Sequence, residues 1–146
     1  MNRVLIIGDS CKDIFVYGRI HRLTPEAPVP VFNPIKETSN DGMAKNVANN
    51  VEALNVEIFT ITNPNSIKKI RYVDHKSNQL VLRVDEHDYC ERIDQDLLIT
   101  IVGNKAQAWG SEGTKFDAII ISDYCKGFLN EKDIEFICKN NKKCFY

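Results

Sequence analysis

The chain alternates short apolar segments with polar turns. Residues 3–8 and 116–122 are rich in β-branched side chains and end in polar residues, which predicts two buried parallel strands that run into loops. Residues 57–62 predict a third strand. Apolar side chains recur at helical spacing over residues 43–54, which predicts a helix opened by residues 40–42.

Two other segments are strand-like but do not fit the middle of a sheet. Residues 15–32 are interrupted by prolines, which cannot donate to a central hydrogen-bond ladder and therefore favour an edge strand or a protruding flap. The alternating runs 68–74 and 79–85 flank the polar residues 75–78, which predicts a β-hairpin. We expect a lid built from strands near 15–32 and 68–85.

The C-terminal part continues the alternation. Residues 93–109 predict a helix, and Asn130 followed by Asp133 resembles a capping box that opens another. Residues 144–146 resemble the beginning of a further strand. This order predicts an α/β fold with a parallel-sheet core and a β-strand flap, in a single domain over residues 1–146.

Composition narrows the choice of partners. The 146 residues are 43% hydrophobic and 27% charged, and a formal net charge of -1 offers no excess of positive charge to nucleic acid or an anionic membrane. The N-terminal apolar run, residues 4–7, is too short for a signal peptide or a membrane span, so we expect a cytoplasmic protein. Five cysteines and three histidines follow no ligand spacing, so we expect neither a metal site nor a disulfide framework.

Three polar segments follow or precede the predicted core elements: residues 8–13, the helix start at Gly42, and residues 122–127. In open α/β sheets, ligands bind beyond the carboxyl ends of the strands, so we expect these segments to converge on a small molecule. Asp9 is interpreted as structural, closing the turn after the first strand.

Four stretches of the chain resemble the N-terminal half of the ribokinase-like (PfkB) carbohydrate kinases, and most closely the D-glycero-D-manno-heptose-7-phosphate kinase branch. They are VLIIGDSCKDIFVYGRIHRLTPEAPVPVF, GMAKNVANNVEAL, KKIRYVDHKSNQLVLRVD and IIISDYCKGFL. The resemblance implies an incomplete ribokinase-like core with a lid. It also implies transfer of the ATP γ-phosphoryl group, with Mg²⁺, to the anomeric hydroxyl of a heptose 7-phosphate or a related sugar phosphate.

The resemblance also implies a sugar site. Asp13 falls where the family has a carboxylate that accepts hydrogen bonds from sugar hydroxyls. Gly42 and Asn46 match the family's Gly-Gly-x-x-Asn signature, in which glycine permits close approach of the ligand and the asparagine amide both donates and accepts. Met43 stands where the second family glycine usually lies, which indicates a reshaped pocket.

The predicted hairpin carries further charged candidates. Lys69 and Arg71 share one face of the first strand, and Arg83 and Asp85 share one face of the return strand. The resemblance places them near the acceptor, where cations would hold the sugar's own phosphate. A solvated ribbon of mixed charge is the alternative interpretation.

Two candidates follow the strand at 116–122. The resemblance places Lys126 on the phosphoryl path, with Asp123 as its expected partner. Beyond that strand the resemblance weakens. The family's C-terminal Gly-Ala-Gly-Asp motif, which supplies the catalytic base, does not occur in this sequence, so the base would lie beyond Tyr146 and no catalytic residue is assigned. The family's usual helix and strand between Thr62 and Ser66 are also reduced to a turn.

Two functions fit these departures. In the first, the chain is part of a sugar kinase, inactive alone, whose remainder completes the sheet and binds ATP. In the second, it is a non-catalytic sugar-phosphate-binding or dimerisation module, with lid strands that pair across a homodimer.

Overall fold

The computed structural model describes residues 2–103 and 116–146 as two four-stranded sheets and three helices. The core sheet has the order β4-β1-β7-β8, and all its neighbouring strands are parallel. Its strands are β1 (Arg3–Gly8), β4 (Glu57–Thr62), β7 (Ala118–Ser122) and β8 (Cys144–Phe145). The predicted parallel core is therefore confirmed, and β8 shows that a further strand does begin near residue 144.

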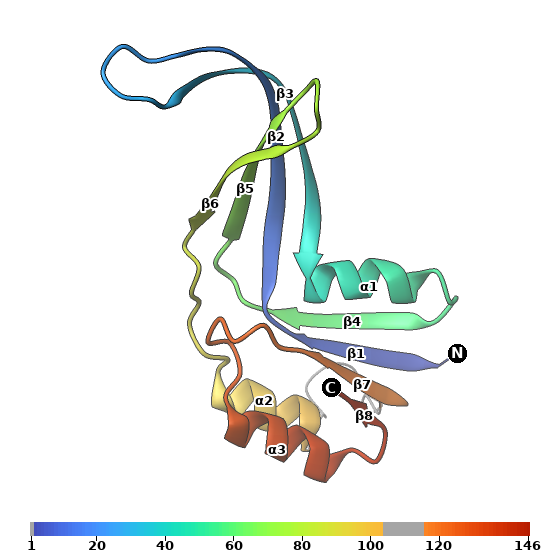
Figure 1. The fold of residues 1–146 in the computed structure, drawn as a ribbon. Coiled ribbons are helices and arrows are strands. Elements are labelled where there is room, and N and C mark those ends of the chain that lie inside the picture. The colour runs from blue at the N-terminus through green and yellow to red at the C-terminus, as the bar shows by residue number, and fades with distance from the viewer. Residues whose placement is uncertain (1, 104–115) are drawn as a thin grey trace.

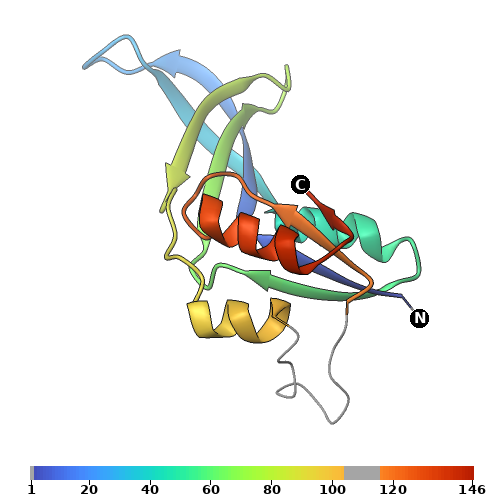
Figure 2. The same ribbon diagram turned by 90° about the horizontal axis from the view of Figure 1, so that it is seen from below.

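Helices cover both faces of the core sheet, as Figures 1 and 2 show. They are α1 (Ala44–Glu52) on one face, and α2 (Gln95–Val102) and α3 (Glu131–Asn140) together on the other. The alternation of side chains along β1 explains this arrangement, because Val4 and Ile6 pack with α1 whereas Leu5 and Ile7 belong to the cluster under α2 and α3. A strand buried on both faces is expected to be continuously apolar.

The second sheet, which we call the lid, stands away from the core (Figure 1). Its order is β3-β2-β5-β6, with antiparallel pairs at both ends and a parallel pair in the middle. Its strands are β2 (Ser10–Leu23), β3 (Pro30–Met43), β5 (Ile67–Asp74) and β6 (Leu80–Glu86). The predicted flap and hairpin are confirmed. Of residues 15–32, however, 15–23 lie in β2, an inner strand of the lid, and only 30–32 belong to the edge strand β3.

Two predicted loops are strands instead. Residues 10–13 belong to β2, and residues 40–42 belong to β3 and do not open a helix. The antiparallel ladder between β2 and β3 runs as far as the pair Ser10–Met43, so the backbone groups of both segments are already used in extended pairing. The prediction missed this because glycine and asparagine in a strand resemble a turn.

The remaining boundaries agree closely with the predictions. Asn130 accepts a hydrogen bond from the N–H of Asp133 and the Asp133 side chain accepts from the N–H of Asn130, which confirms the capping box. The helix predicted over residues 93–109 is present as α2, and its positions 104–109 lie outside the described residues. Within the described part of the chain, no helix is long and apolar enough to cross a membrane.

Candidate functional site

Asp9 joins three segments at the carboxyl end of β1. Its side chain is fully buried, and its carboxylate accepts hydrogen bonds from the N–H groups of Tyr124 (2.7 Å), Lys126 (3.2 Å) and Phe128 (3.3 Å). Its backbone carbonyl accepts from the N–H of Ala44, the first residue of α1, at 2.9 Å. The structural interpretation of Asp9 is confirmed, and it explains how the loop after β7 and the start of α1 are held beside β1.

A cavity of about 360 Å³ lies where these segments meet the lid. Its lining comes from β2, β3, β5, the first turn of α1 and the loop after β7. Six of the eight predicted substrate residues are among the residues that line it: Asp13, Gly42, Met43, Asn46, Lys69 and Arg71. Their convergence comes from the tertiary structure, whereas their role as ligand contacts stays a prediction.

Asp13 and Arg71 form an ion pair inside this cavity, with Arg71 Nη1 and Asp13 Oδ1 2.5 Å apart. Both side chains are about three-quarters buried, and the Arg71 guanidinium also lies over the Phe15 ring, 5.2 Å from its centroid. The pair is therefore fixed from two sides. The second carboxylate oxygen of Asp13 lies 3.9 Å from Cys11 Sγ and can accept a further hydrogen bond from a hydroxyl group.

Gly42 is needed here for space and not for a turn. A Cβ atom built at this position would lie 2.4 Å from Asp13 Oδ2 and 2.5 Å from Cys11 Sγ. Any other residue would displace the Asp13 carboxylate. The sequence predicted this glycine at a helix start, whereas the structure places it in β3 opposite Cys11.

Met43 occupies a backbone conformation that glycine adopts more readily. Its φ is 57° and its ψ is -131°, and its side chain is buried against the core cluster. This geometry agrees with the observation that the kinase signature usually has glycine at this position. Asn46, in the first turn of α1, carries its amide to the cavity wall.

Asp88, in the link after β6, bridges two lysines. The sequence places Lys69 on the hairpin and Lys126 on the phosphoryl path. The Asp88 carboxylate is 2.7 Å from Lys126 Nζ and 3.9 Å from Lys69 Nζ. The Lys126 and Lys69 side chains are only 19% and 12% exposed, and Lys69 lines the cavity. Sequence reasoning missed Asp88, because a lone carboxylate between a hairpin and a helix carries no motif.

The expected pairing of Lys126 with Asp123 is wrong. Asp123 accepts a hydrogen bond from the N–H of Cys125 at 3.0 Å, while Lys126 is held by Asp88. Burial raises the pKa of the Asp123 carboxyl, the Cys125 N–H opposes this rise, and the neighbouring Asp9 carboxyl adds to it. Asp123 is thus part of the folded loop after β7 and not the counter-ion of the lysine.

Arg83 and Asp85 do not line the cavity. They form a bidentate ion pair with each other, with nitrogen-to-oxygen distances of 2.6 Å. The prediction that they share one strand face is confirmed by this contact. Tyr124 does line the cavity, and the sequence marked only the stretch around it.

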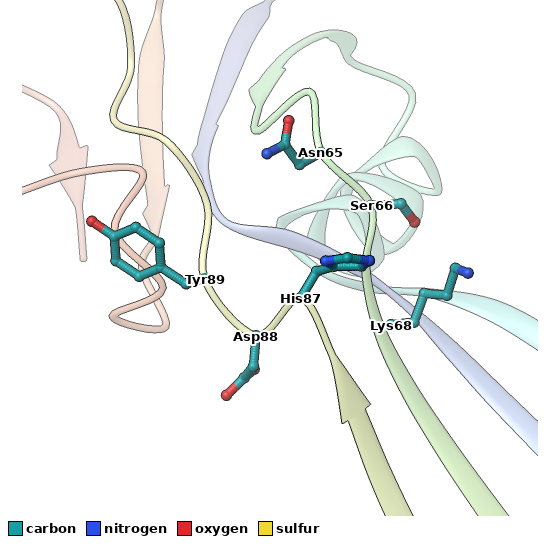
Figure 3. A pocket seen from close by; sticks show the side chains of 6 residues that line it. All are labelled: Asn65, Ser66, Lys68, His87, Asp88 and Tyr89. Atoms are coloured by element: carbon teal, nitrogen blue, oxygen red, sulfur yellow. The ribbon is translucent and has the colours of Figure 1, made fainter.

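A second hollow, of about 830 Å³, lies at the junction of lid and core (Figure 3). Six side chains line it: Asn65, Ser66, Lys68, His87, Asp88 and Tyr89. The β4–β5 link that borders it is held by Asn63, whose side chain accepts from the N–H of Ser10 at 2.6 Å and donates to the Ser10 carbonyl at 3.2 Å. The short link is therefore tied to the beginning of β2.

Residues 2–103 and 116–146 contain no group of three or more His, Cys, Asp or Glu side chains that could hold a metal ion. Near the cavity, Asp13 pairs with Arg71 and Asp88 with the two lysines, whereas Asp41 also lines the cavity and is exposed.

Comparison with solved structures identifies the fold. Phosphofructokinase-2 from Escherichia coli in complex with fructose-6-phosphate matches with a TM-score of 0.51 and 10% sequence identity, over 98% of this chain and 53% of that chain. The chain therefore has the fold of the ribokinase-like carbohydrate kinases, as the sequence predicted. No protein-family model matches it.

Comparison with curated proteins identifies its sequence relatives, the bifunctional HldE proteins. The chain is 32% identical over 160 residues to the bifunctional protein HldE of Helicobacter pylori (strain J99 / ATCC 700824), a match covering 89% of this chain and 33% of that protein. The HldE of Campylobacter jejuni (strain RM1221) is 29% identical, over 96% of this chain and 33% of its own length. The chain spans about one third of the length of these relatives.

Proposed function

We propose that this chain forms the acceptor side of a carbohydrate kinase and binds a sugar phosphate between lid and core. The observation that carries the proposal is the cavity of about 360 Å³, in which carboxylate, amide and cationic side chains from five segments meet. Such a combination suits a polyhydroxylated ligand that also carries negative charge.

The sugar hydroxyls are assigned to Asp13 and Asn46. The carboxylate of Asp13 accepts hydrogen bonds without donating them, and its pairing with Arg71 fixes its orientation before the ligand arrives. The amide of Asn46, which also lines the cavity, offers one acceptor and two donors. Gly42 keeps the approach to Asp13 open.

The phosphate of the sugar is assigned to Lys69 and Arg71 on β5. Lys69 shares the single carboxylate of Asp88 with Lys126, so this cluster of three groups carries one net positive charge. A phosphate group would supply the missing negative charge. Because the sequence relatives are HldE proteins, we infer a heptose 7-phosphate as acceptor and its anomeric hydroxyl as the group that is phosphorylated.

ATP is the inferred phosphoryl donor, and Lys126, on the loop after β7, is assigned to the side of the cavity from which the phosphoryl group arrives. Mg²⁺ is expected only for the complete enzyme. Since phosphoryl transfer depends on positioning and electrostatic stabilisation, the role of this chain is to orient the acceptor hydroxyl and neutralise charge.

Calorimetric titration tests the proposal. The chain should bind heptose 7-phosphate, and Asp13→Ala and Asn46→Ala should each weaken binding by about tenfold or more, because each removes a side chain assigned to the sugar hydroxyls. Asn50→Ala, one turn further along α1, is the matched control and should bind like the wild type. Binding that is unchanged in both site variants would refute the site assignment.

A homodimer through the lid is the second candidate, favoured by one face of β6. Leu80, Leu82 and Val84 alternate along this edge strand and are 57%, 55% and 37% exposed. An apolar row at a sheet edge is covered well by a second copy of the same surface. Sedimentation velocity should detect a dimer that Leu82→Lys dissociates, and a wild-type monomer at all concentrations would exclude it.

Activity measurements separate the two functions named at the outset. Both functions predict sugar-phosphate binding without transfer by this chain alone. ATP-dependent phosphorylation that appears when the remainder of a kinase domain is supplied would identify the kinase part, and its absence under the same conditions would identify the non-catalytic binding module.

A further inference from the structure

Two cysteines on different elements lie side by side far from the cavity lining. Cys138 is in the last turn of α3 and exposed, and Cys144 begins β8 and is partly buried. Their sulfur atoms are 3.2 Å apart. A disulfide bond needs about 2.05 Å between the sulfurs, so a shift of about 1 Å would bring them to bonding distance.

The backbone on both sides holds this geometry. The segment that joins the two cysteines is short, and within it the Asn141 side chain donates to the carbonyl of Ile137 at 3.0 Å. The N–H of Ile119 in β7 donates to the carbonyl of Lys143, also at 3.0 Å. The thiols are therefore brought together by α3 and β7 and do not depend on a chance meeting of two mobile ends.

We propose that Cys138 and Cys144 form a reversible intramolecular disulfide, which makes this pair a thiol-oxidation site. The oxidant is a low-molecular-weight disulfide. The Cys138 thiolate attacks one of its sulfurs, a mixed disulfide forms, and one small thiolate leaves. Cys144 then loses its proton and attacks the Cys138 sulfur, releasing the second thiolate. Two protein thiols are oxidised, and one small disulfide is reduced to two thiols.

The environment of the two sulfurs sets the order of these steps. Burial, with a further contribution from the adjacent Cys138, raises the pKa of Cys144 to about 12. Cys138 is the exposed thiol and reacts first. Once it is in a mixed disulfide, its sulfur can no longer carry the charge that opposes ionisation of Cys144, so the second step becomes easier.

The bond would act on the most weakly held strand of the core sheet. β8 has two residues, and it pairs with β7 through Cys144 and Phe145. A disulfide closing a loop of this size removes conformational freedom from the unfolded chain and ties β8 to α3. We expect oxidation to raise the Tm by about 5 °C.

The test incubates the reduced full chain with oxidised glutathione, blocks the remaining thiols with iodoacetamide and digests with trypsin. Because lysines lie between the two cysteines, trypsin separates them, and their peptides stay joined only through a disulfide. The wild type should give this linked pair. Cys125→Ser removes another exposed cysteine and is the matched control that should leave the linked pair unchanged.

Two variants make the assignment specific. Cys144→Ser should retain one glutathione on Cys138, because no neighbouring thiol displaces it, whereas less than about one tenth of the wild type should retain it at this position. Cys144 in Cys138→Ser should react with glutathione disulfide at least about tenfold more slowly than Cys138 does in Cys144→Ser. Stable glutathione adducts on both Cys138 and Cys144 of the wild type would overturn the proposal. Equal retention of glutathione on Cys138 by the wild type and Cys144→Ser would overturn it as well. The wild-type peptide map decides the question even where a variant is less stable.

Discussion

The core sheet and the lid are both built from β-strands, but the side chains of these strands have different surroundings. In the core, β1 buries apolar side chains on both faces, and its charged neighbour Asp9 is satisfied by backbone N–H groups. In the lid, strands of up to 14 residues carry charges that pair across the sheet, and the ion pair of Asp13 with Arg71 faces a cavity. Under the proposed function, the core supplies stability and the lid supplies recognition, and four substitutions test this division.

The largest expected effect is on the core side. Asp9→Ala would leave three backbone N–H groups in the loop after β7 without their acceptor, and we expect a loss of about 3 kcal/mol in the free energy of unfolding. Urea denaturation measures it. Asp117→Ala, an acidic residue at the other end of the core, should cost less, and equal losses in the two variants would contradict the anchoring role of Asp9.

At the boundary of the two regions, Gly42→Ala should damage binding more than stability. The added Cβ meets Asp13 Oδ2 and Cys11 Sγ, and the displaced carboxylate can no longer orient the sugar. We expect binding of the sugar phosphate to weaken by about tenfold or more and stability to fall by about 1–2 kcal/mol. Calorimetry and urea denaturation measure the two effects, with Ser39→Ala on the same strand as control. If Gly42→Ala bound the sugar phosphate with wild-type affinity, the claim that Gly42 keeps the Asp13 carboxylate in position for binding would be contradicted.

The third test concerns pH. Burial alone would raise the pKa of Asp133, but the Arg92 side chain and the N–H of Asn130 hold it below its ordinary value. The carboxylate therefore stabilises the fold above the pKa it has in the unfolded chain, and this stability is lost as the pH falls through the lower folded-state pKa, in the acid range below about 4.

Asp133→Asn keeps an acceptor for the helix cap but removes the charge. We expect it to cost about 1 kcal/mol at pH 7 and to reduce the loss of stability between pH 7 and pH 3. Urea denaturation at the two pH values measures both changes. If the variant lost as much stability on acidification as the wild type, the ionised Asp133 carboxylate would not be the source of the pH-dependent stability.

The smallest expected effect is on the lid side. Asp88→Asn removes the carboxylate shared by Lys69 and Lys126, so a phosphate no longer competes with it. Sugar-phosphate binding should tighten by about threefold, with a stronger dependence on salt. Asp74→Asn, at the tip of the β5–β6 hairpin, is the control and should bind like the wild type. Weaker binding in Asp88→Asn would show that Asp88 contacts the ligand itself.

The predictions from sequence succeeded where the chemistry is local. Periodic apolar residues located the strands of the core, and the spacing from Asn130 to Asp133 located a helix cap, because each depends on neighbours along the chain. They failed for residues 10–13 and 40–42, whose extended conformation comes from pairing across two strands. They also failed for the partner of Lys126, since the ion pair with Asp88 joins residues 38 positions apart.

The sequence by itself determined the alternation of strands and helices, the lid and the kinase-like resemblance, because hydrophobic period and motif spacing are properties of neighbouring residues. Only the tertiary structure decided which charges meet. A side chain of the right type can pair with any opposite charge that the fold brings within a few ångströms, and that choice depends on strand register and on anchors such as Asp9. The cavity between lid and core is therefore a product of packing, built in part from residues that the sequence could name but not place.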